Sequence, residues 1–298
     1  MEKYDFVFIG HTSFNRIIPF KGSPKIVSGG AVTFAAMAAA ALGKRTALIT
    51  KSLKRDESTF MPLKEKGVDV FLLPAEESTH LKIIYPSENV DIREMYQEKN
   101  AGPITIEEMP LINASFLHLC PVTGQDFTFD LMKDLKEKGY HLSIDMQGFV
   151  RHLDPVTLKI HLRDAPGKKE IFSLAEKVKV DVLEAKLLTG TSDLEKAAFI
   201  LEDLGSRETM ITRSDGVLLR YDGKTYFEKF SNRYTLGRTG RGDTTFSAYI
   251  SRRMDHNPSE SLKFAAALAS IKLENPGPFN NTLEAVLHRM EDPFFRKS

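Results

Sequence analysis

The sequence has very little cysteine, no excess of charge of either sign and no long apolar run. Its single cysteine, Cys120 in SFLHLCPV, excludes an internal disulfide framework and any metal site built from several cysteines. We interpret it as a small buried apolar residue at a strand end. Lysine and arginine total 41 against 40 acidic residues, so no whole-molecule field would draw the protein to nucleic acid or to an anionic membrane.

Two further absences narrow the ligand chemistry and the location. Neither a G-x-G-x-x-G dinucleotide fingerprint nor a G-x-x-x-x-G-K-[ST] P-loop occurs. No apolar run reaches membrane-spanning length, and MEKYDFVFIG has no basic segment before an apolar one, which predicts a cytoplasmic protein. The 298 residues are enough for a large core in one or two domains. Because the basic and acidic residues balance, any positively charged ligand site must be local.

Short apolar runs alternate with helical patterns along most of the chain. Apolar runs at 5–10, 45–51 and 68–73 are separated by helical patterns at 29–43 and 56–67. The same alternation continues from SFLHLCPV to ETMITR, and three helical segments follow residue 243. This pattern predicts an α/β fold with a mostly parallel sheet covered by helices.

Two stretches, 11–28 and 80–100, break the alternation with polar, strand-like sequence and no helical period. We interpret them as a small β lid, because ligands of open α/β sheets bind at the carboxyl ends of strands and need a cover there. Ordinary surface hairpins have equal support from the pattern alone. Lid strands have edges that a second copy could cover, so the sequence is compatible with a homodimer through the lid.

The segment GRTGRGDTTFSAYI, residues 237–250, combines glycines and arginines with an aspartate at the start of an expected helix. Backbone N–H groups of Gly240, Arg241 and Gly242 could hold a phosphoryl group at the N-terminus of a helix that begins near Asp243. The Asp243 carboxylate could then take the proton of an attacking hydroxyl. The alternative is that Asp243 is only a helix N-cap, which the preceding glycines and arginine disfavour.

Polar residues also gather near other expected strand ends. Gly29 and Gly30 precede an alanine-rich helix, where they form either a ligand-binding turn or a plain tight turn. Asp145, Gln147 and Arg151 follow a strand, and their hydrogen-bonding capacity suits a hydroxylated or phosphorylated ligand. The alternative is that they are the ordinary polar residues of a surface loop.

Asp181 and Glu184 lie at the end of another strand and the entry to a helix. Carboxylates at this position could hold Mg²⁺ through its waters beside phosphates. They could equally be a helix cap and a first-turn acid.

These stretches, in this order, resemble the ribokinase-like (PfkB) family of carbohydrate kinases over essentially the whole chain, and GRGD is the most specific signal. The resemblance implies one domain, 1–298, with a three-layer αβα sandwich and a β lid. It also implies ATP and Mg²⁺ as cofactors and transfer of the γ-phosphoryl group to a substrate hydroxyl.

Position by position, the resemblance implies roles for the candidate residues. Asp243 corresponds to the catalytic base, and Gly240, Arg241 and Gly242 to the anion hole. Glu184 and Asp181 correspond to the motif that orders Mg²⁺ and phosphate. The substrate side corresponds to Asn15, Gly29, Gly30 and Thr33, beside Asp145, Gln147 and Arg151. The nucleotide side corresponds to Thr212, Arg213, Ser214, Gly216 and Asn275.

Departures from the family pattern bear on the substrate. Arg241 replaces a usual Ala and Asn15 a frequent Asp, which disfavours a standard ribose or fructose-phosphate site. DMQGFVR together with GRTGRGDTTF is most similar to the subset that includes myo-inositol kinases, so a polyol or sugar acid is expected. The alternatives are a non-catalytic nucleotide or sugar sensor, and a kinase for a phosphosugar or a nucleoside.

Overall fold

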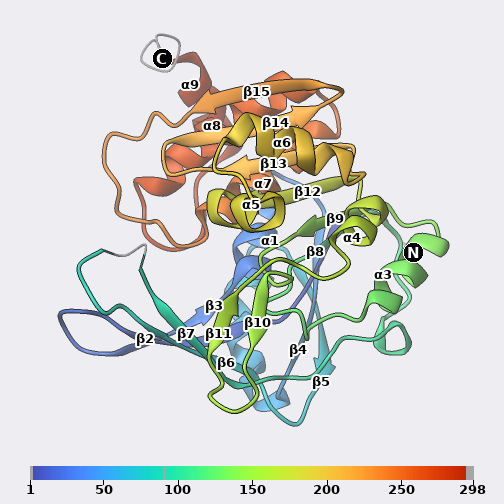
Figure 1. Ribbon diagram of the computed structural model, residues 1–298, viewed down its shortest axis with the longest axis vertical. Helices are drawn as coiled ribbons and strands as arrows, with labels where there is room; N and C mark the ends of the chain where they lie inside the picture. Colours follow the sequence, from blue (N-terminus) through green and yellow to red (C-terminus); the bar gives the residue numbers. More distant parts are fainter. Residues whose placement is uncertain (1–2, 90–91, 293–298) are drawn as a thin grey trace.

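The computed structural model describes residues 3–89 and 92–292 (Figure 1). Within them, nine strands form the main sheet in the order β15-β14-β13-β12-β9-β8-β1-β4-β5. The strands are β1 (Tyr4–Ile9), β4 (Thr46–Ser52), β5 (Asp69–Pro74), β8 (Ala114–Leu119), β9 (Leu142–Asp145), β12 (Lys177–Asp181), β13 (Glu208–Thr212), β14 (Gly216–Tyr221) and β15 (Lys224–Lys229). Those from β13 to β5 run parallel, as predicted, whereas β14 and β15 extend one edge as antiparallel strands.

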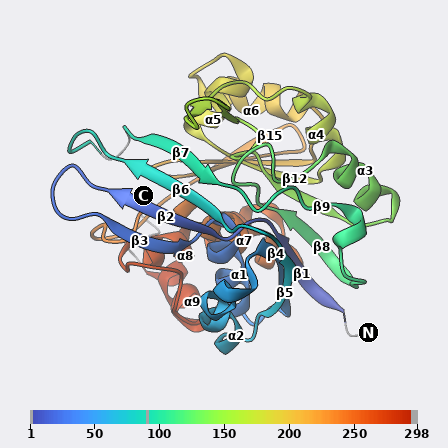
Figure 2. The same ribbon diagram turned by 90° about the horizontal axis from the view of Figure 1, so that it is seen from below.

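Helices cover both faces of this sheet (Figure 2). One layer holds α1 (Ala31–Ala41), α2 (Met61–Glu65), α7 (Arg241–Arg253), α8 (Pro258–Leu273) and α9 (Leu283–Glu291). The other holds α3 (Phe129–Glu137), α4 (Lys168–Leu174), α5 (Val182–Thr189) and α6 (Leu194–Asp203). Alternate residues of β1 feed the two cores, Phe6 and Phe8 on the α1 side and Val7 and Ile9 on the α3 side. The predicted three-layer αβα sandwich is therefore confirmed.

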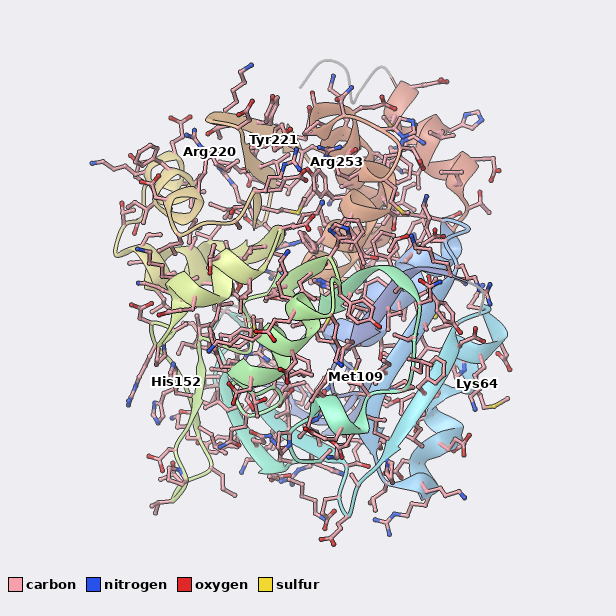
Figure 3. The ribbon with its side chains drawn as sticks, turned by 90° about the vertical axis from the view of Figure 1, so that its right-hand side faces the viewer. Lys64, Met109, His152, Arg220, Tyr221 and Arg253 are labelled. Atoms are coloured by element: carbon pink, nitrogen blue, oxygen red, sulfur yellow. The ribbon has the colours of Figure 1, made fainter. Side chains whose placement is uncertain are left out.

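Close packing of α1 and α7 brings the segment 237–250 toward the Gly29–Gly30 turn. The α1 alanines at 35, 36, 38 and 39 are fully buried, and Ser247 of α7 donates a hydrogen bond to the Ala35 carbonyl at 2.6 Å. At the far end of α7, the Arg253 guanidinium lies over the ring of Tyr221 in β14, 5.6 Å from its centroid (Figure 3). The helix is thus held at its middle against α1 and at its C-terminal end against β14.

The two segments that break the alternation form one four-stranded sheet with the order β3-β2-β6-β7. Its strands are β2 (Ser13–Ile18), β3 (Lys25–Gly29), β6 (Thr79–Ile84) and β7 (Glu94–Lys99). Strand β2 pairs with β6 in parallel, so the segments are not independent surface hairpins. A two-stranded sheet of β10 (Arg151–Leu153) and β11 (Ile160–Leu162), which the sequence pattern did not predict, adjoins β7 through a bridge between Tyr96 and Lys159.

Some local predictions are corrected or confirmed in detail. The helix expected at 56–67 is a 3₁₀ helix, Lys54–Phe60, followed by α2, because Pro62 in the first turn of α2 has no N–H to continue a helical ladder. A second 3₁₀ helix spans Ile106–Glu108. Cys120 is 1% exposed directly after β8, as predicted. Among the described helices, none is both long and apolar enough to cross a membrane.

Candidate active site

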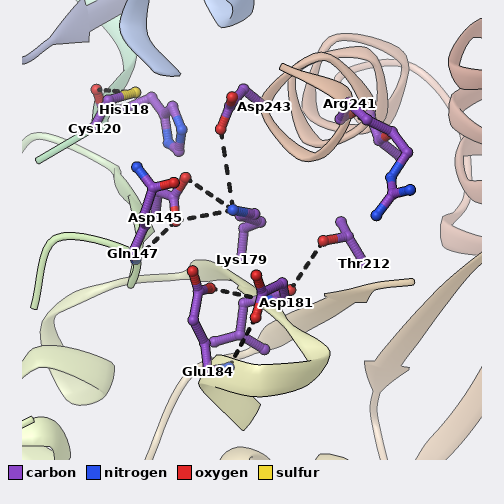
Figure 4. Close-up of polar contacts among 12 residues, drawn as sticks. His118, Cys120, Asp145, Gln147, Lys179, Asp181, Glu184, Thr212, Arg241 and Asp243 are labelled. Atoms are coloured by element: carbon purple, nitrogen blue, oxygen red, sulfur yellow. Dashed lines mark hydrogen bonds and ion pairs between the residues drawn. The ribbon is translucent and has the colours of Figure 1, made fainter. Parts of the chain in front are cut away.

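A buried lysine joins two carboxylates at the carboxyl end of the main sheet (Figure 4). Lys179 of β12 is 4% exposed, and its Nζ lies 3.2 and 3.1 Å from the two carboxylate oxygens of Asp145 at the end of β9. The same Nζ lies 4.0 Å from Oδ1 of Asp243. Asp145 is 1% exposed, so its charge is compensated almost entirely by this lysine.

Lys179 was absent from the sequence-based candidates, although the pattern carries a signal for it. In KVKVD, the strand β12, polar residues Lys177, Lys179 and Asp181 alternate with valines. Alternation with period two places these three side chains on one face of the strand. The valines by themselves predict only a buried strand.

Asp243 is the third residue of α7, which begins at Arg241, two residues earlier than expected. The N-cap is Gly240, so the alternative in which Asp243 caps the helix is wrong. Gly240 has a φ of 77°, and a Cβ there would lie 2.2 Å from the Phe34 ring. Only glycine fits this turn without displacing Phe34.

Burial and charge oppose each other in setting the pKa values of this cluster. Burial raises the pKa of Asp243 to about 6, against the lowering effect of Lys179. Burial alone would lower the pKa of Lys179, but Asp145, Glu184 and Asp243 together raise it above its usual value. At neutral pH the lysine is therefore charged and Asp243 is largely ionised.

The first turn of α7 lies directly on the ends of β12 and β13. A Cβ on Gly242 would lie 3.0 Å from Cε of Lys179 and 3.3 Å from Oγ1 of Thr212. The N–H of Arg241 donates to the Arg238 carbonyl at 3.2 Å, so it is already engaged in the turn before the helix. The predicted anion-hole segment and the predicted base thus lie together, over the strand that carries Lys179.

Asp181 and Glu184 form a reciprocal capping box at the start of α5. Asp181 Oδ1 accepts the Glu184 N–H at 2.8 Å, and Glu184 Oε2 accepts the Asp181 N–H at 2.7 Å. Burial, then the Asp181 charge, raises the pKa of Glu184 to about 8, so a cation here would stabilise the ionised pair. Among the described residues, no group of three or more His, Cys, Asp or Glu side chains forms a metal cage. The pair fits an ion such as Mg²⁺ that keeps waters and phosphate ligands.

Gln147 lies in the turn after β9, and Arg151 begins β10 directly after this turn. The backbone N–H of Gln147 donates to Asp145 Oδ1 at 2.9 Å, and Nη1 of Arg151 donates to the Val122 carbonyl at 3.2 Å. Arg151 therefore ties the start of β10 to the loop after β8. The role of Asp145, Gln147 and Arg151 in binding a substrate stays a prediction.

The remaining substrate-side candidates lie where the lid meets α1. Asn15 of β2 accepts a hydrogen bond from the Ser13 hydroxyl at 3.1 Å. Gly29 ends β3, Gly30 is the N-cap of α1, and the Thr33 hydroxyl in the first turn is buried with no partner among the described residues.

The predicted nucleotide-side residues are dispersed. Thr212 ends β13 beside Gly242, and its hydroxyl donates to the Val180 carbonyl at 3.4 Å. Arg213 forms two 2.9 Å hydrogen bonds to Asp215, while Ser214 and Gly216 complete the tight connection into β14. Asn275 binds the Ile271 carbonyl at 2.9 Å. It lines a groove of about 380 Å³ between α8 and α9 with Ile271, Glu274, Asn281, Ala285, His288, Arg289 and Asp292.

A second buried lysine, Lys272 of α8, was also missed. It is 1% exposed, and its Nζ donates to the Gly237 carbonyl at 3.0 Å and lies 5.6 Å from the centroid of the Phe34 ring. Burial lowers its pKa to about 8, although Asp243 opposes the shift. The signal in the sequence is one lysine within an apolar helix, FAAALASIKL.

Comparison with known proteins identifies the family of this fold and site. The model of the pfkB family of carbohydrate kinases matches residues 6–285. The chain belongs to this family. A pfkB relative, the cytidine kinase of Thermococcus kodakarensis, is 27% identical over 266 residues, covering 86% of this chain and 91% of the relative.

Two solved structures of a pyrophosphate-dependent kinase in the ribokinase family are also similar to this pfkB protein. One is a sulfate complex, with a TM-score of 0.87 and 33% identity over 95% of this chain and 99% of the other. The second holds a pyrophosphate analogue and myo-inositol, with a TM-score of 0.86 and 32% identity over the same shares. The predicted resemblance to the ribokinase-like family, including its inositol-kinase subset, is confirmed. The prediction that ATP is the donor is not confirmed, because these two structures are of a pyrophosphate-dependent kinase.

Proposed function

We propose that this pfkB protein transfers a terminal phosphoryl group from a phosphoanhydride donor to a hydroxyl of a small sugar or polyol. The observation that carries the proposal is the largely buried Asp243 in the first turn of α7, 4.0 Å from the Lys179 ammonium. A base for a hydroxyl proton must be ionised at working pH and close to the transferring group. The Lys179 ammonium beside Asp243 favours its ionised form, and Asp243 stands at a helix N-terminus, which attracts phosphate.

In this mechanism, the oxygen of the acceptor hydroxyl bonds to phosphorus while the anhydride P–O bond of the donor breaks. Asp243 accepts the proton that this hydroxyl loses. The helix N-terminus and the nearby basic groups stabilise the negative charge of the transferring phosphoryl group and of the leaving phosphate. Lys179 holds Asp145 and Asp243 in place. Asp181 and Glu184 would hold Mg²⁺ through its waters, and the ion would neutralise charge on the donor phosphates.

The family resemblance makes ATP the expected donor, whereas two observations favour pyrophosphate. Lys272 favours pyrophosphate, because it adds a buried cation beneath the segment 237–243, at the Gly237 carbonyl. A donor without a nucleoside depends on such charges for its binding energy. The similarity to a pyrophosphate-dependent kinase supports the same choice.

For the acceptor, a polyol of the myo-inositol type is favoured. Asn15, Gln147 and Arg151 offer amides and one cation, which suit neutral hydroxyls or a carboxylate. The cytidine kinase relative makes a nucleoside the alternative acceptor. A sensor without catalysis is the alternative outside enzymes, and the Asp243–Lys179 geometry argues against it.

The test is product formation from ATP or pyrophosphate with cyclitols, sugars, sugar acids, sugar phosphates and nucleosides. We expect Asp243→Asn to lower turnover by a factor of about 10² to 10⁴, because a general base is lost, while donor binding persists. Asp222→Asn in the exposed β14–β15 turn is the matched control and should keep full turnover. Turnover by Asp243→Asn equal to that of the control would remove Asp243 from the mechanism.

The homodimer through the lid stays a prediction. Strand β3 is an edge of the lid sheet, and its Ile26 is 74% exposed, so a second copy would find an apolar edge there. The molar mass in solution tests it.

A further inference from the structure

The lid carries a buried amide that the rest of the described structure does not satisfy. Gln97 of β7 is 2% exposed, and neither its Oε1 nor its Nε2 has a hydrogen-bond partner among the described residues. Buried amides in folded proteins are almost always hydrogen-bonded, since an unpaired one loses its water without compensation. A side chain with both amide atoms unpaired calls for a partner from outside the chain.

The backbone around Gln97 is held firmly, so the side chain is not buried through loose packing of a lid edge. Its backbone N–H donates to the Leu158 carbonyl at 2.9 Å, and the neighbouring Tyr96 forms a bridge with Lys159. These contacts join β7 to the two-stranded sheet of β10 and β11. The amide is therefore presented from a fixed strand.

The strand register places Gln97 on the face of the lid that meets the main sheet. Gln97 is opposite Leu81 in β6, and Leu81 is opposite Asn15 in β2, so the three side chains form one row across the lid. Leu81 and Met95 pack against Val122, whose carbonyl is held by Arg151. The row thus faces the loops that carry the proposed acceptor-binding residues.

Other buried polar atoms without described partners lie around Thr79 of β6, two residues before Leu81. His11 Nδ1 contacts Thr79 Oγ1 at 2.9 Å, but His11 Nε2 and the hydroxyl of the adjacent Thr12 are buried without described partners. The N–H of Ala101 also donates to Thr79 Oγ1, at 3.1 Å. Nδ2 of the adjacent Asn100 is likewise buried without a described partner. Gln97 is therefore one of several buried polar groups without described partners, from both the lid and the end of β1.

We propose that Gln97 binds the acceptor and contributes to its specificity by contacting two adjacent hydroxyl groups. Its Nε2 donates to one hydroxyl oxygen, and its Oε1 accepts from the neighbouring hydroxyl, a pairing that a vicinal diol satisfies. Asn15, on the other side of Leu81, addresses a more distant part of the same ring. This assignment rests on the proposed transfer to a sugar or polyol.

The test replaces the amide with an apolar side chain of similar size, Gln97→Leu. We expect the KM for myo-inositol to rise about tenfold or more, as the loss of a two-point hydrogen bond predicts, with kcat nearly unchanged. Without ligand, the melting temperature should hold or rise, because an unsatisfied amide has been removed. Glu98→Gln, on the opposite face of β7, is the matched control and should keep the KM.

Deoxy-inositols, each lacking one hydroxyl, show which hydroxyls meet Gln97. Wild type should discriminate against the analogues that lack one of the two, and Gln97→Leu should lose that discrimination. A KM equal to that of Glu98→Gln, or a lower melting temperature with unchanged KM, would show a structural role and overturn the inference.

Failure of the proposed function gives a different result. If wild type phosphorylates none of the polyols, sugars or nucleosides with either donor, the kinase assignment is wrong. Ligand-induced thermal stabilisation by the same compounds then decides the role of Gln97. Stabilisation of wild type that disappears in Gln97→Leu supports the binding role, and its persistence in the variant, or its absence from wild type, contradicts it.

Discussion

The Lys179 cluster at the carboxyl end of the main sheet and Gln97 on the inner face of the lid show opposite treatment of buried polar groups. At the sheet, Lys179 compensates Asp145, and Asp181 and Glu184 satisfy each other's backbone N–H groups. On the lid, Gln97 is equally buried and has no partner among the described residues. The comparison indicates that the charges of the Lys179 cluster are paired before a ligand arrives, whereas the Gln97 amide is paired only when a ligand binds.

The difference has a physical basis, because the two regions order their polar groups at different stages, one during folding and the other on ligand binding. Fixed charges that stabilise a transition state act best if they are oriented during folding and need no reorganisation in the reaction. Specificity, in contrast, comes from polar groups that only the correct ligand can satisfy, because a wrong ligand leaves them unpaired. Substitution should therefore lower stability at Lys179, where a pairing is lost, and hold or raise it at Gln97, where an unpaired amide is removed.

The largest effect is expected for Lys179→Met. Removing the lysine leaves the Asp145 charge buried and uncompensated, so the free energy of unfolding should fall by about 3–5 kcal/mol, measured by urea denaturation. Lys177→Met is the matched control, because Lys177 lies on the same strand, is also mostly buried and contacts the Phe116 ring outside the cluster. If both variants lose the same stability, the charge pairing of Lys179 is not what matters.

Gly240→Ala should have the next largest effect. A Cβ meets the Phe34 ring at 2.2 Å and the φ of 77° is strained for alanine, so we expect a loss of about 1–3 kcal/mol together with lower turnover. Gly223→Ala has a φ of 70° with nothing within 4 Å of its Cβ, and so measures the backbone strain alone. Equal losses in the two variants would mean that contact with Phe34 does not position α7.

The smallest effect is expected in the pH dependence of kcat/KM, which should change on substitution at the sheet but not on substitution in the lid. Because Asp243 must be ionised to accept a proton and its pKa is raised to about 6, kcat/KM should rise with pH and level off above that value. At pH 5 it should be about tenfold below its value at pH 7. Gln97→Leu should retain this limb, whereas Lys179→Met should shift it to higher pH because a cation beside Asp243 is lost. A flat profile from pH 5 to 7 would contradict the assignment of the base.

Much of the fold and part of the site could be predicted because local patterns encode them. The alternation of apolar strands and helices predicts the layered α/β sheet, and the polar segments 11–28 and 80–100 mark the lid strands closely. Asp243 was found because glycines and arginines around it have no use in an ordinary helix cap. The strand pair β10–β11 was missed because strands of three residues resemble loops in sequence, and β14–β15 was missed because this antiparallel hairpin lies outside the alternation of strands and helices.

Lys179, Lys272 and Gln97 were missed for a common reason. Each lies in a segment whose overall pattern is that of an ordinary strand or helix, and its importance depends on residues far away in the chain. Lys179 meets Asp145, 34 residues earlier, and Lys272 meets Gly237, 35 residues earlier. Gln97 is notable only because nothing around it provides a hydrogen bond.

The sequence by itself determined the class of fold and the two lid segments, and it marked Asp243 as a candidate for phosphate chemistry, because periodicity, glycine placement and helix starts are local properties. Tertiary structure alone decided which charges meet and which polar atoms stay unpaired. Parallel strands β9 and β12 become neighbours only through the packing of the intervening chain, and the row from Asn15 to Gln97 exists only through pairing of separate lid segments. Such contacts follow from strand order and register, which no single stretch of sequence specifies.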